Sequence, residues 1–220
     1  MNAMGRMFII LLSWVALTCA SCDGHRDFPD DSMKVGDVLC TDGDVMNPEA
    51  FGKSGKEAIA IVFHINNDNN VEGRGYAVYL WDLEQAAFAD STGVKQGTSA
   101  DLSALDGNAN TYTMYEGKNC GSPLAERVFA LWKYGQSAYI PSVAQMRLLK
   151  ASKTAVNPYI ESCGGDVLPD EADLCWYWTS TEVGGQEESK AWLYSLQSGA
   201  IQETPKLHSY KARPVITINY

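Results

Sequence analysis

The sequence lacks the patterns on which several classes of function depend. It has 17 basic residues against 27 acidic ones, a formal net charge of −10, and no cluster of Lys and Arg that would follow a phosphate backbone. We therefore expect no nucleic-acid partner. The apolar run FIILLSWVALT near the N-terminus is shorter than the roughly 20 residues that a bilayer core requires, so it does not predict a permanent transmembrane helix.

Catalytic constellations are also missing from the sequence. The three histidines, His25, His64 and His208, have no evident nucleophile or orienting acid beside them. The segment GKSGK at 52–56 lacks the earlier glycine of a phosphate-binding loop, and we interpret it as a turn. The sequence therefore predicts a non-catalytic protein.

The N-terminal segment is typical of a bacterial export signal. A basic start is followed by the apolar run and then by the small residues Ala20 and Ser21 in front of Cys22. This pattern resembles a lipoprotein signal over residues 1–21, after which Cys22 becomes the lipidated first residue. Ordinary secretion, with cleavage after Ala20 or Ser21, is the alternative. Residues 22–34 are polar and predict a short tether to the membrane.

Residues 35–220 are expected to form a single domain. AIAIVFHIN at 58–66 alternates like a strand with one buried face, and GYAVYLWDL at 75–83 predicts the second arm of a hairpin. A shorter strand pair is expected at 35–45. Residues 84–121 are rich in small and polar residues, which indicates loops and small helical turns.

The second half of the chain combines helices and strands. Ser122 with Pro123 predicts one helix start, and Ser142 with Gln145 completes a capping box at another. Asn157 and Pro158 predict a third, short helix. Strand-like segments follow: CWYWTSTE, AWLYSLQSG, IQET and ARPVITINY. Strands, helices and strands again, without regular alternation, predict an α+β domain with twisted antiparallel sheets and two main helices.

Four cysteines follow Cys22. An even number of cysteines in an exported protein favours two disulfides, although four cysteines permit three pairings. We expect Cys163 to pair with Cys175 because this closes a modest loop, and Cys40 to pair with Cys120 by elimination. A metal–thiolate site is the alternative, but no C-x-x-C spacing is present.

No metal or other cofactor is expected. Asp42 with Asp44, and Asp68 among asparagines, offer oxygen ligands that calcium could use. Neither segment has the spacing or the terminal bidentate glutamate of a helical calcium loop, and Asp and Asn are common in turns. Structural calcium is the alternative.

Four motifs in order resemble one bacterial family. They are AYIPSVAQMRLL, CWYWTSTE, AWLYSLQSGAIQ and KARPVIT, and the upstream GDVL and AIVFHIN fit the same pattern. Together they resemble the domain family named after the C-terminal domain of a collagen-like bacterial adhesin. The likeness covers most of residues 35–218. The sequence departs from the family pattern at Ala138, Gln145 and Ala212.

The resemblance implies a C-type-lectin-like fold and adhesion to glycans or extracellular polymers. Formylglycine-generating enzymes share the wider fold, but their reactive-cysteine pattern is not recognisable here. In CWYWTSTE the density of aromatic residues predicts a central strand covered on both faces. Glu182 ends this strand and Arg213 begins the last motif, so we expect a partly buried bidentate ion pair between them.

These observations predict a lipid-anchored binding or adhesion domain on the outer membrane of a Gram-negative bacterium, at its surface or its periplasmic face. Its partner is expected to be an extracellular glycan or an envelope protein. The candidate ligand-stacking residues are Tyr112, Tyr115, Trp81 and Trp192. The alternatives are a structural or anchoring subunit of a surface assembly and, third, an enzyme of the formylglycine-generating type.

Overall fold

A computed structural model describes residues 32–68, 71–117, 120–131 and 137–219. The predicted signal peptide, the lipidation site Cys22 and most of the tether lie outside the described residues. Residues Met33–Tyr220 form one compact unit. Within the described part of the chain, no helix is both long and apolar enough to span a membrane.

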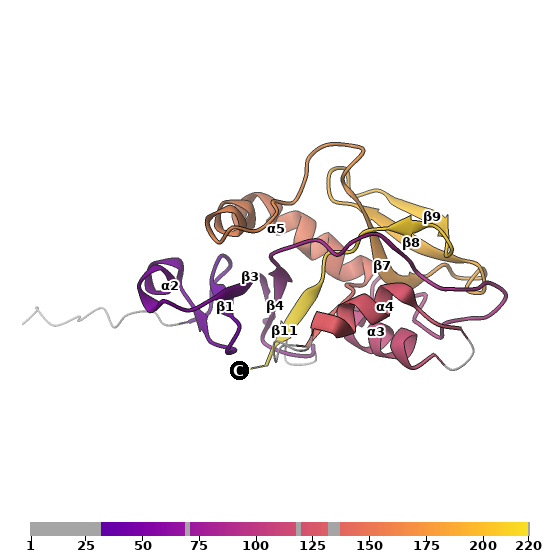
Figure 1. Ribbon diagram of the computed structural model, residues 1–220, viewed down its shortest axis with the longest axis horizontal. Helices are drawn as coiled ribbons and strands as arrows, with labels where there is room; N and C mark the ends of the chain where they lie inside the picture. Colours follow the sequence, from indigo (N-terminus) through magenta and orange to yellow (C-terminus); the bar gives the residue numbers. More distant parts are fainter. Residues whose placement is uncertain (1–31, 69–70, 118–119, 132–136, 220) are drawn as a thin grey trace, which may run out of the picture. The chain divides into compact units, whose positions relative to one another are not determined.

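A six-stranded antiparallel sheet forms the first layer of this unit (Figure 1). Its order is β2-β1-β3-β4-β11-β6. The strands are β1 Val38–Cys40, β2 Val45–Met46, β3 Ala58–Ile65, β4 Gly75–Tyr79, β6 Ala138–Tyr139 and β11 Val215–Ile218. The predicted hairpin of β3 with β4 and the short pair β1 with β2 are both confirmed.

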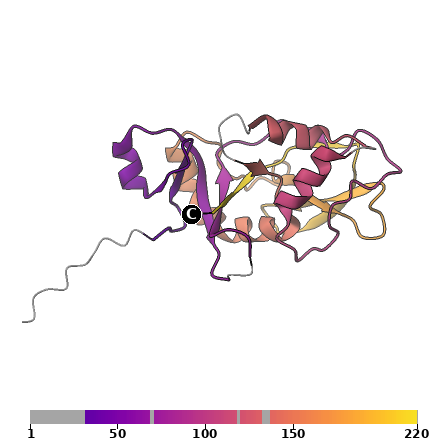
Figure 2. The same cartoon turned by 90° about the horizontal axis from the view of Figure 1, so that it is seen from below.

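Both faces of β3 are buried, whereas the sequence predicted one. Ile61 and Phe63 join a core cluster with α5 (Val143–Ser162). Ala60 and Val62 join a second cluster with the helices α3 (Gly107–Glu116) and α4 (Pro123–Phe129). Figure 2 shows α5 on one side of the strands and α3 with α4 on the other. The small side chains of alanines on β3 and β4 leave room for this second layer.

A three-stranded sheet, β7-β8-β9, carries the aromatic segment. Its strands are β7 Trp176–Glu182, β8 Lys190–Ser195 and β9 Ile201–Pro205. Trp178 is fully buried, packs edge-on against Phe88 and Tyr210, and donates a hydrogen bond from Nε1 to the carbonyl of Ala86. Burial of such a ring stabilises the fold by about 2 to 3 kcal/mol. The predicted burial of both faces is confirmed, but β7 is an edge strand of this sheet and β8 is the central one, so the prediction of a central strand is wrong.

A small two-stranded sheet pairs β5 (Ala86–Ala87) with β10 (Ser209–Tyr210). It lies next to Trp178, since Ala86 accepts the indole hydrogen bond and Tyr210 packs against the ring. The strand β5 follows β4 along the chain, so the small sheet packs this part of the chain against Trp178 on β7.

The helices are α2 Pro48–Ser54, α3 Gly107–Glu116, α4 Pro123–Phe129 and α5. The Ser122 cap of α4 and the capping box at the start of α5 are confirmed. The prediction of a separate third helix that begins at Asn157 is wrong, because α5 continues through Pro158. Its buried side extends across this point to Val156 and Ile160, and that packing outweighs the one backbone donor that proline lacks.

The class is therefore α+β, with antiparallel pairing in each of the described sheets. The C-type-lectin-like assignment stays a prediction. Two helices were not predicted from the sequence. The helix α2 overlaps the segment interpreted as a turn, and α3 lies inside the region expected to form loops and small helical turns.

Candidate functional site

A groove of about 370 Å³ lies between the first turns of α3, the end of α4 and the edge strand β6. We call it the α3 groove. Its described lining consists of Glu72, Asn108, Ala109, Thr111, Tyr112, Phe129, Ser137, Ala138 and Tyr139. The groove combines aromatic faces, hydroxyls, one amide and one carboxylate, which are the groups that binding sites for small polar ligands use.

Exposed aromatic side chains border the α3 groove. Tyr112 is 50% exposed and donates a hydrogen bond of 2.5 Å from its hydroxyl to Glu116 Oε1, one helical turn later. The Glu116 carboxylate raises the pKa of Tyr112 through this bond. Tyr115, equally exposed, stacks on Phe129 with ring centroids 3.7 Å apart and planes 3° apart. The predicted candidates Tyr112 and Tyr115 thus belong to one exposed helical face.

The spacing of the buried residues along α3 explains why Tyr112 and Tyr115 are exposed. Its buried residues are Gly107, Asn110, Thr111 and Met114, so the opposite side of the helix faces solvent. Most of this buried face is polar or small, which is why apolar periodicity did not reveal the helix.

Polar contacts hold the walls of the α3 groove in place. Gln145 Oε1 accepts hydrogen bonds from the backbone of Gly107 at 3.2 Å and of Ser142 at 3.0 Å, and so joins the start of α3 to the start of α5. Thr111 Oγ1 accepts a bond of 2.9 Å from the backbone of Ile140, which follows β6. These buried bonds fix α3 relative to β6, so the groove is preformed.

The floor of the α3 groove contains Tyr139, whose hydroxyl is 2.9 Å from Thr217 Oγ1 and accepts a bond of 2.9 Å from Gln145 Nε2. Burial raises the pKa of Tyr139 well above its usual range, so this phenol stays neutral. At the rim, Asn108 Nδ2 donates to Glu72 Oε1 at 3.3 Å. Both of these rim side chains are solvent-accessible polar groups.

The other two stacking candidates lie elsewhere. Trp81, 38% exposed, lines a second groove of about 380 Å³ with Tyr79, Leu83 and Leu131, and it meets Tyr79 edge-on at 5.7 Å. Trp192 on β8 is half-buried and packs against the core cluster that contains α5. The structure therefore does not bring the four predicted aromatics together.

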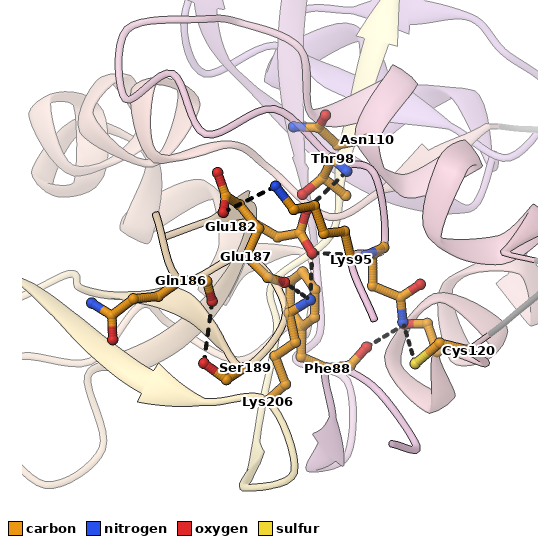
Figure 3. A network of polar contacts seen from close by, with 12 residues as sticks. Phe88, Lys95, Thr98, Asn110, Cys120, Glu182, Gln186, Glu187, Ser189 and Lys206 are labelled. Atoms are coloured by element: carbon orange, nitrogen blue, oxygen red, sulfur yellow. Dashed lines mark hydrogen bonds and ion pairs between the residues drawn. The ribbon is translucent and has the colours of Figure 1, made fainter. Parts of the chain in front are cut away.

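The predicted ion pair between Glu182 and Arg213 is wrong. Glu182 instead pairs with Lys206, and both side chains are almost completely buried. The carboxylate also accepts hydrogen bonds from the backbone of Gln96 at 2.8 Å and of Thr98 at 3.1 Å (Figure 3). Lys206 additionally donates to the carbonyl of Glu187. This buried cluster fixes the long segment after β5 to the three-stranded sheet.

Arg213 has different partners because its guanidinium points to the turn after β4. It donates to Asp82 Oδ1 at 2.9 Å and to the carbonyl of Asp166. Asp82 also accepts from Lys211 at 2.8 Å and from the Tyr177 hydroxyl at 3.1 Å. Asp82, which sequence analysis did not single out, thus provides the counter-charge expected from Glu182.

Neither predicted disulfide is formed: Cys40, Cys120, Cys163 and Cys175 are free. The thiols have other partners. Cys175 Sγ lies 3.1 Å from Ser195 Oγ on the neighbouring strand, and Cys120 Sγ lies 3.3 Å from Ser91 Oγ. Burial raises the pKa of Cys40 and of Cys163. Loop length alone was a poor guide: Cys163 packs against the core cluster that contains Cys40, whereas Cys175 contacts Ser195.

Two of the three acidic residues considered for calcium, Asp42 and Asp44, form ion pairs with one lysine. The ammonium of Lys56 lies 2.6 Å from Asp42 Oδ2 and also contacts Asp44, and these hydrogen bonds raise the pKa of Lys56. No group of three His, Cys, Asp or Glu side chains with the geometry of a metal site occurs among the described residues. Neither of the two grooves contains a cysteine or a histidine in its described lining.

Comparison with known proteins gives a fold but no family. No family model matches the chain, and no curated protein matches it. A solved structure, a fimbrial protein from Bacteroides ovatus ATCC 8483, is similar with a TM-score of 0.68 and 16% sequence identity. The likeness covers 84% of this chain and 49% of that one, so this chain spans about half the length of the fimbrial protein. The similarity establishes a shared fold.

Proposed function

We propose that this protein is a cell-surface binding domain and that its α3 groove takes an extracellular glycan. The single observation that carries the proposal is the preformed groove with exposed Tyr112 beside the Asn108 and Glu72 pair. Aromatic faces stack on the apolar faces of sugar rings, and amide and carboxylate groups bond their hydroxyls. The protein would act without catalysis and without a metal.

The location that we propose is the outer membrane of a Gram-negative bacterium, with a lipid on Cys22 as the anchor. The support is the lipoprotein-like pattern of residues 1–22 and the fold shared with a fimbrial protein. A strongly acidic protein gains no attraction from anionic headgroups, so attachment would depend on the lipid. The resemblance to the collagen-like adhesin family supports the same setting.

A glycan array tests the proposed function. The purified protein, Tyr112→Ala and the control Leu207→Ala are applied with calcium and again with chelator. Leu207 is 51% exposed and lies outside the α3 groove, so it matches Tyr112 in exposure. We expect binding by the wild type and by Leu207→Ala, its loss in Tyr112→Ala, and no effect of chelator. A blank array from folded protein would contradict the proposal.

The second function that we propose is that of a subunit in a surface assembly. The fold shared with a fimbrial protein favours it, as does the separate groove around the exposed Trp81. Sedimentation velocity of the wild type and of Trp81→Ala distinguishes the two roles. Self-association that Trp81→Ala abolishes would favour the assembly subunit, whereas a monomer at all concentrations would argue against an assembly of identical copies.

A further inference from the structure

The charges around the α3 groove have one sign. Glu72 is the one carboxylic acid in its described lining, and a second carboxylate, that of Glu116, accepts a hydrogen bond from the lining residue Tyr112. No Lys, Arg or His belongs to the described lining residues. The chain as a whole carries a net charge of −10. A ligand carboxylate or sulfate entering this groove would meet repulsion and no described counter-charge.

The start of α3 is the one feature that would attract an anion, because a helix N-terminus carries a partial positive charge. Two contacts offset this charge. Asp106 immediately precedes the helix and accepts a hydrogen bond of 2.9 Å from Asn110 Nδ2, and the backbone N–H of Gly107 is already bonded to Gln145. The first two turns therefore present the side chains of Asn108 and Tyr112 to the groove rather than an empty anion site.

The polar pair at the rim suits adjacent hydroxyl groups. The amide of Asn108 and the carboxylate of Glu72 are 3.3 Å apart and combine donors with acceptors. Two neighbouring ring hydroxyls of a sugar can each donate to the carboxylate or accept from the amide. The ring of Tyr112, exposed one helical turn after Asn108, offers a face for stacking.

We infer that the ligand of the α3 groove is an uncharged pyranose unit, held by Glu72 and Asn108 at adjacent hydroxyls and stacked on Tyr112, and that uronic, sialylated and sulfated sugars are rejected. This inference rests on the proposed glycan-binding function and names its ligand class. Specificity arises from repulsion of the charged competitor as well as from attraction of the neutral ring.

The test uses matched ligand pairs. Methyl glycosides of glucose, galactose and mannose are compared with the corresponding uronates, which differ only in a carboxylate at C6. Dissociation constants are measured by NMR titration of the purified protein at low salt. We expect at least one neutral glycoside to bind roughly tenfold more tightly than its own uronate. Glu72→Gln keeps the shape of the side chain and should reduce this ratio by several-fold.

Glu161→Gln is the control, since it removes one negative charge from an exposed position at the far end of α5, outside the groove lining. It should leave the ratio unchanged. Uronate binding as tight as that of the neutral ring, and lost in Tyr112→Ala, would overturn the inference and leave the glycan-binding function intact. No binding of any sugar, or binding of a lysine-rich peptide instead, would overturn both.

Discussion

Glu182 is an almost completely buried charge with three partners. Its carboxylate accepts two backbone hydrogen bonds and contacts the ammonium of Lys206, and the ring of Phe88 lies 5.4 Å from that ammonium. A buried carboxylate requires such partners because leaving it unpaired costs several kcal/mol. The buried Arg213 meets the same requirement with Asp82.

Removal of Lys206 should therefore be strongly destabilising. Lys206→Met leaves Glu182 buried without a counter-charge, and we expect the free energy of unfolding to fall by about 3 to 5 kcal/mol. Urea denaturation followed by tryptophan fluorescence measures the change.

The control for this prediction is Lys53→Met, which breaks an ion pair with Glu49 on the surface of α2. Both partners are more than 70% exposed, so the denaturation midpoint should not change measurably. Equal midpoints for Lys206→Met and the wild type would show that the buried pair is not structural.

The thiols give a second prediction at the residue scale. Burial raises the pKa of Cys163, so little of this half-buried thiol is ionised at pH 8. We expect iodoacetamide to label native Cys163 slowly, at a rate that increases as the pH rises past 9, while the three buried thiols react only after unfolding.

Four alkylated cysteines in the described domain after unfolding without reductant, counted by mass spectrometry, would agree with the structure. Two or fewer would indicate a disulfide.

At the scale of elements, the start of α5 connects the core to the α3 groove. The Ser142 hydroxyl accepts from the backbone of Gln145 and donates to the carbonyl of Ala104 at 2.7 Å. Gln145 in turn holds α3. The Gln145 amide supplies both an acceptor for backbone donors and a donor for Tyr139.

Ser142→Ala should cost about 1 to 2 kcal/mol of stability, because it removes the cap of α5 and one buried hydrogen bond. The matched control is Ser162→Ala at the exposed C-terminal end of the same helix. Differential scanning calorimetry compares the two. A larger loss of stability for Ser162→Ala than for Ser142→Ala would contradict this account of the capping box.

Elements with a local signal could be predicted from the sequence. The β3 and β4 hairpin has alternating apolar residues, and the starts of α4 and α5 have capping serines. The helix α3 has no such signal, since its buried face is mostly polar or small and its contacts come from distant segments. Pro158 misled the prediction because tertiary packing of α5 outweighs the local preference of proline.

The site could be predicted only in part. Tyr112 and Tyr115 were candidates because aromatics are common in sugar sites, but Glu72 and Phe129 join them through long-range topology. Asn108 and Tyr112 are four residues apart, a signal that has meaning only once α3 is known to be a helix. The prediction of the Glu182–Arg213 ion pair also failed because it ignored long-range topology. The order of the strands, and not distance along the sequence, brings Lys206 to Glu182.

At the scale of the whole molecule, the folded unit separates stability from binding. Two core clusters cover both faces of the six-stranded sheet, and the α3 groove lies at the β6 edge of that sheet. The shared fold covers 49% of the fimbrial protein, so the same fold occurs there within a longer chain. The buried hydrogen bonds from Gly107 to Gln145 and from Ile140 to Thr111 hold the α3 groove in place.

The most direct test of the central claim is to locate the ligand on the protein. Backbone amide shifts of isotope-labelled protein are followed while a neutral glycan that binds on the array is added. The account predicts saturable shifts at Asn108, Ala109 and Tyr112 and none around Trp81. Shifts centred on the Trp81 groove, or no shifts at saturating glycan, would contradict the claim that the α3 groove is the binding site.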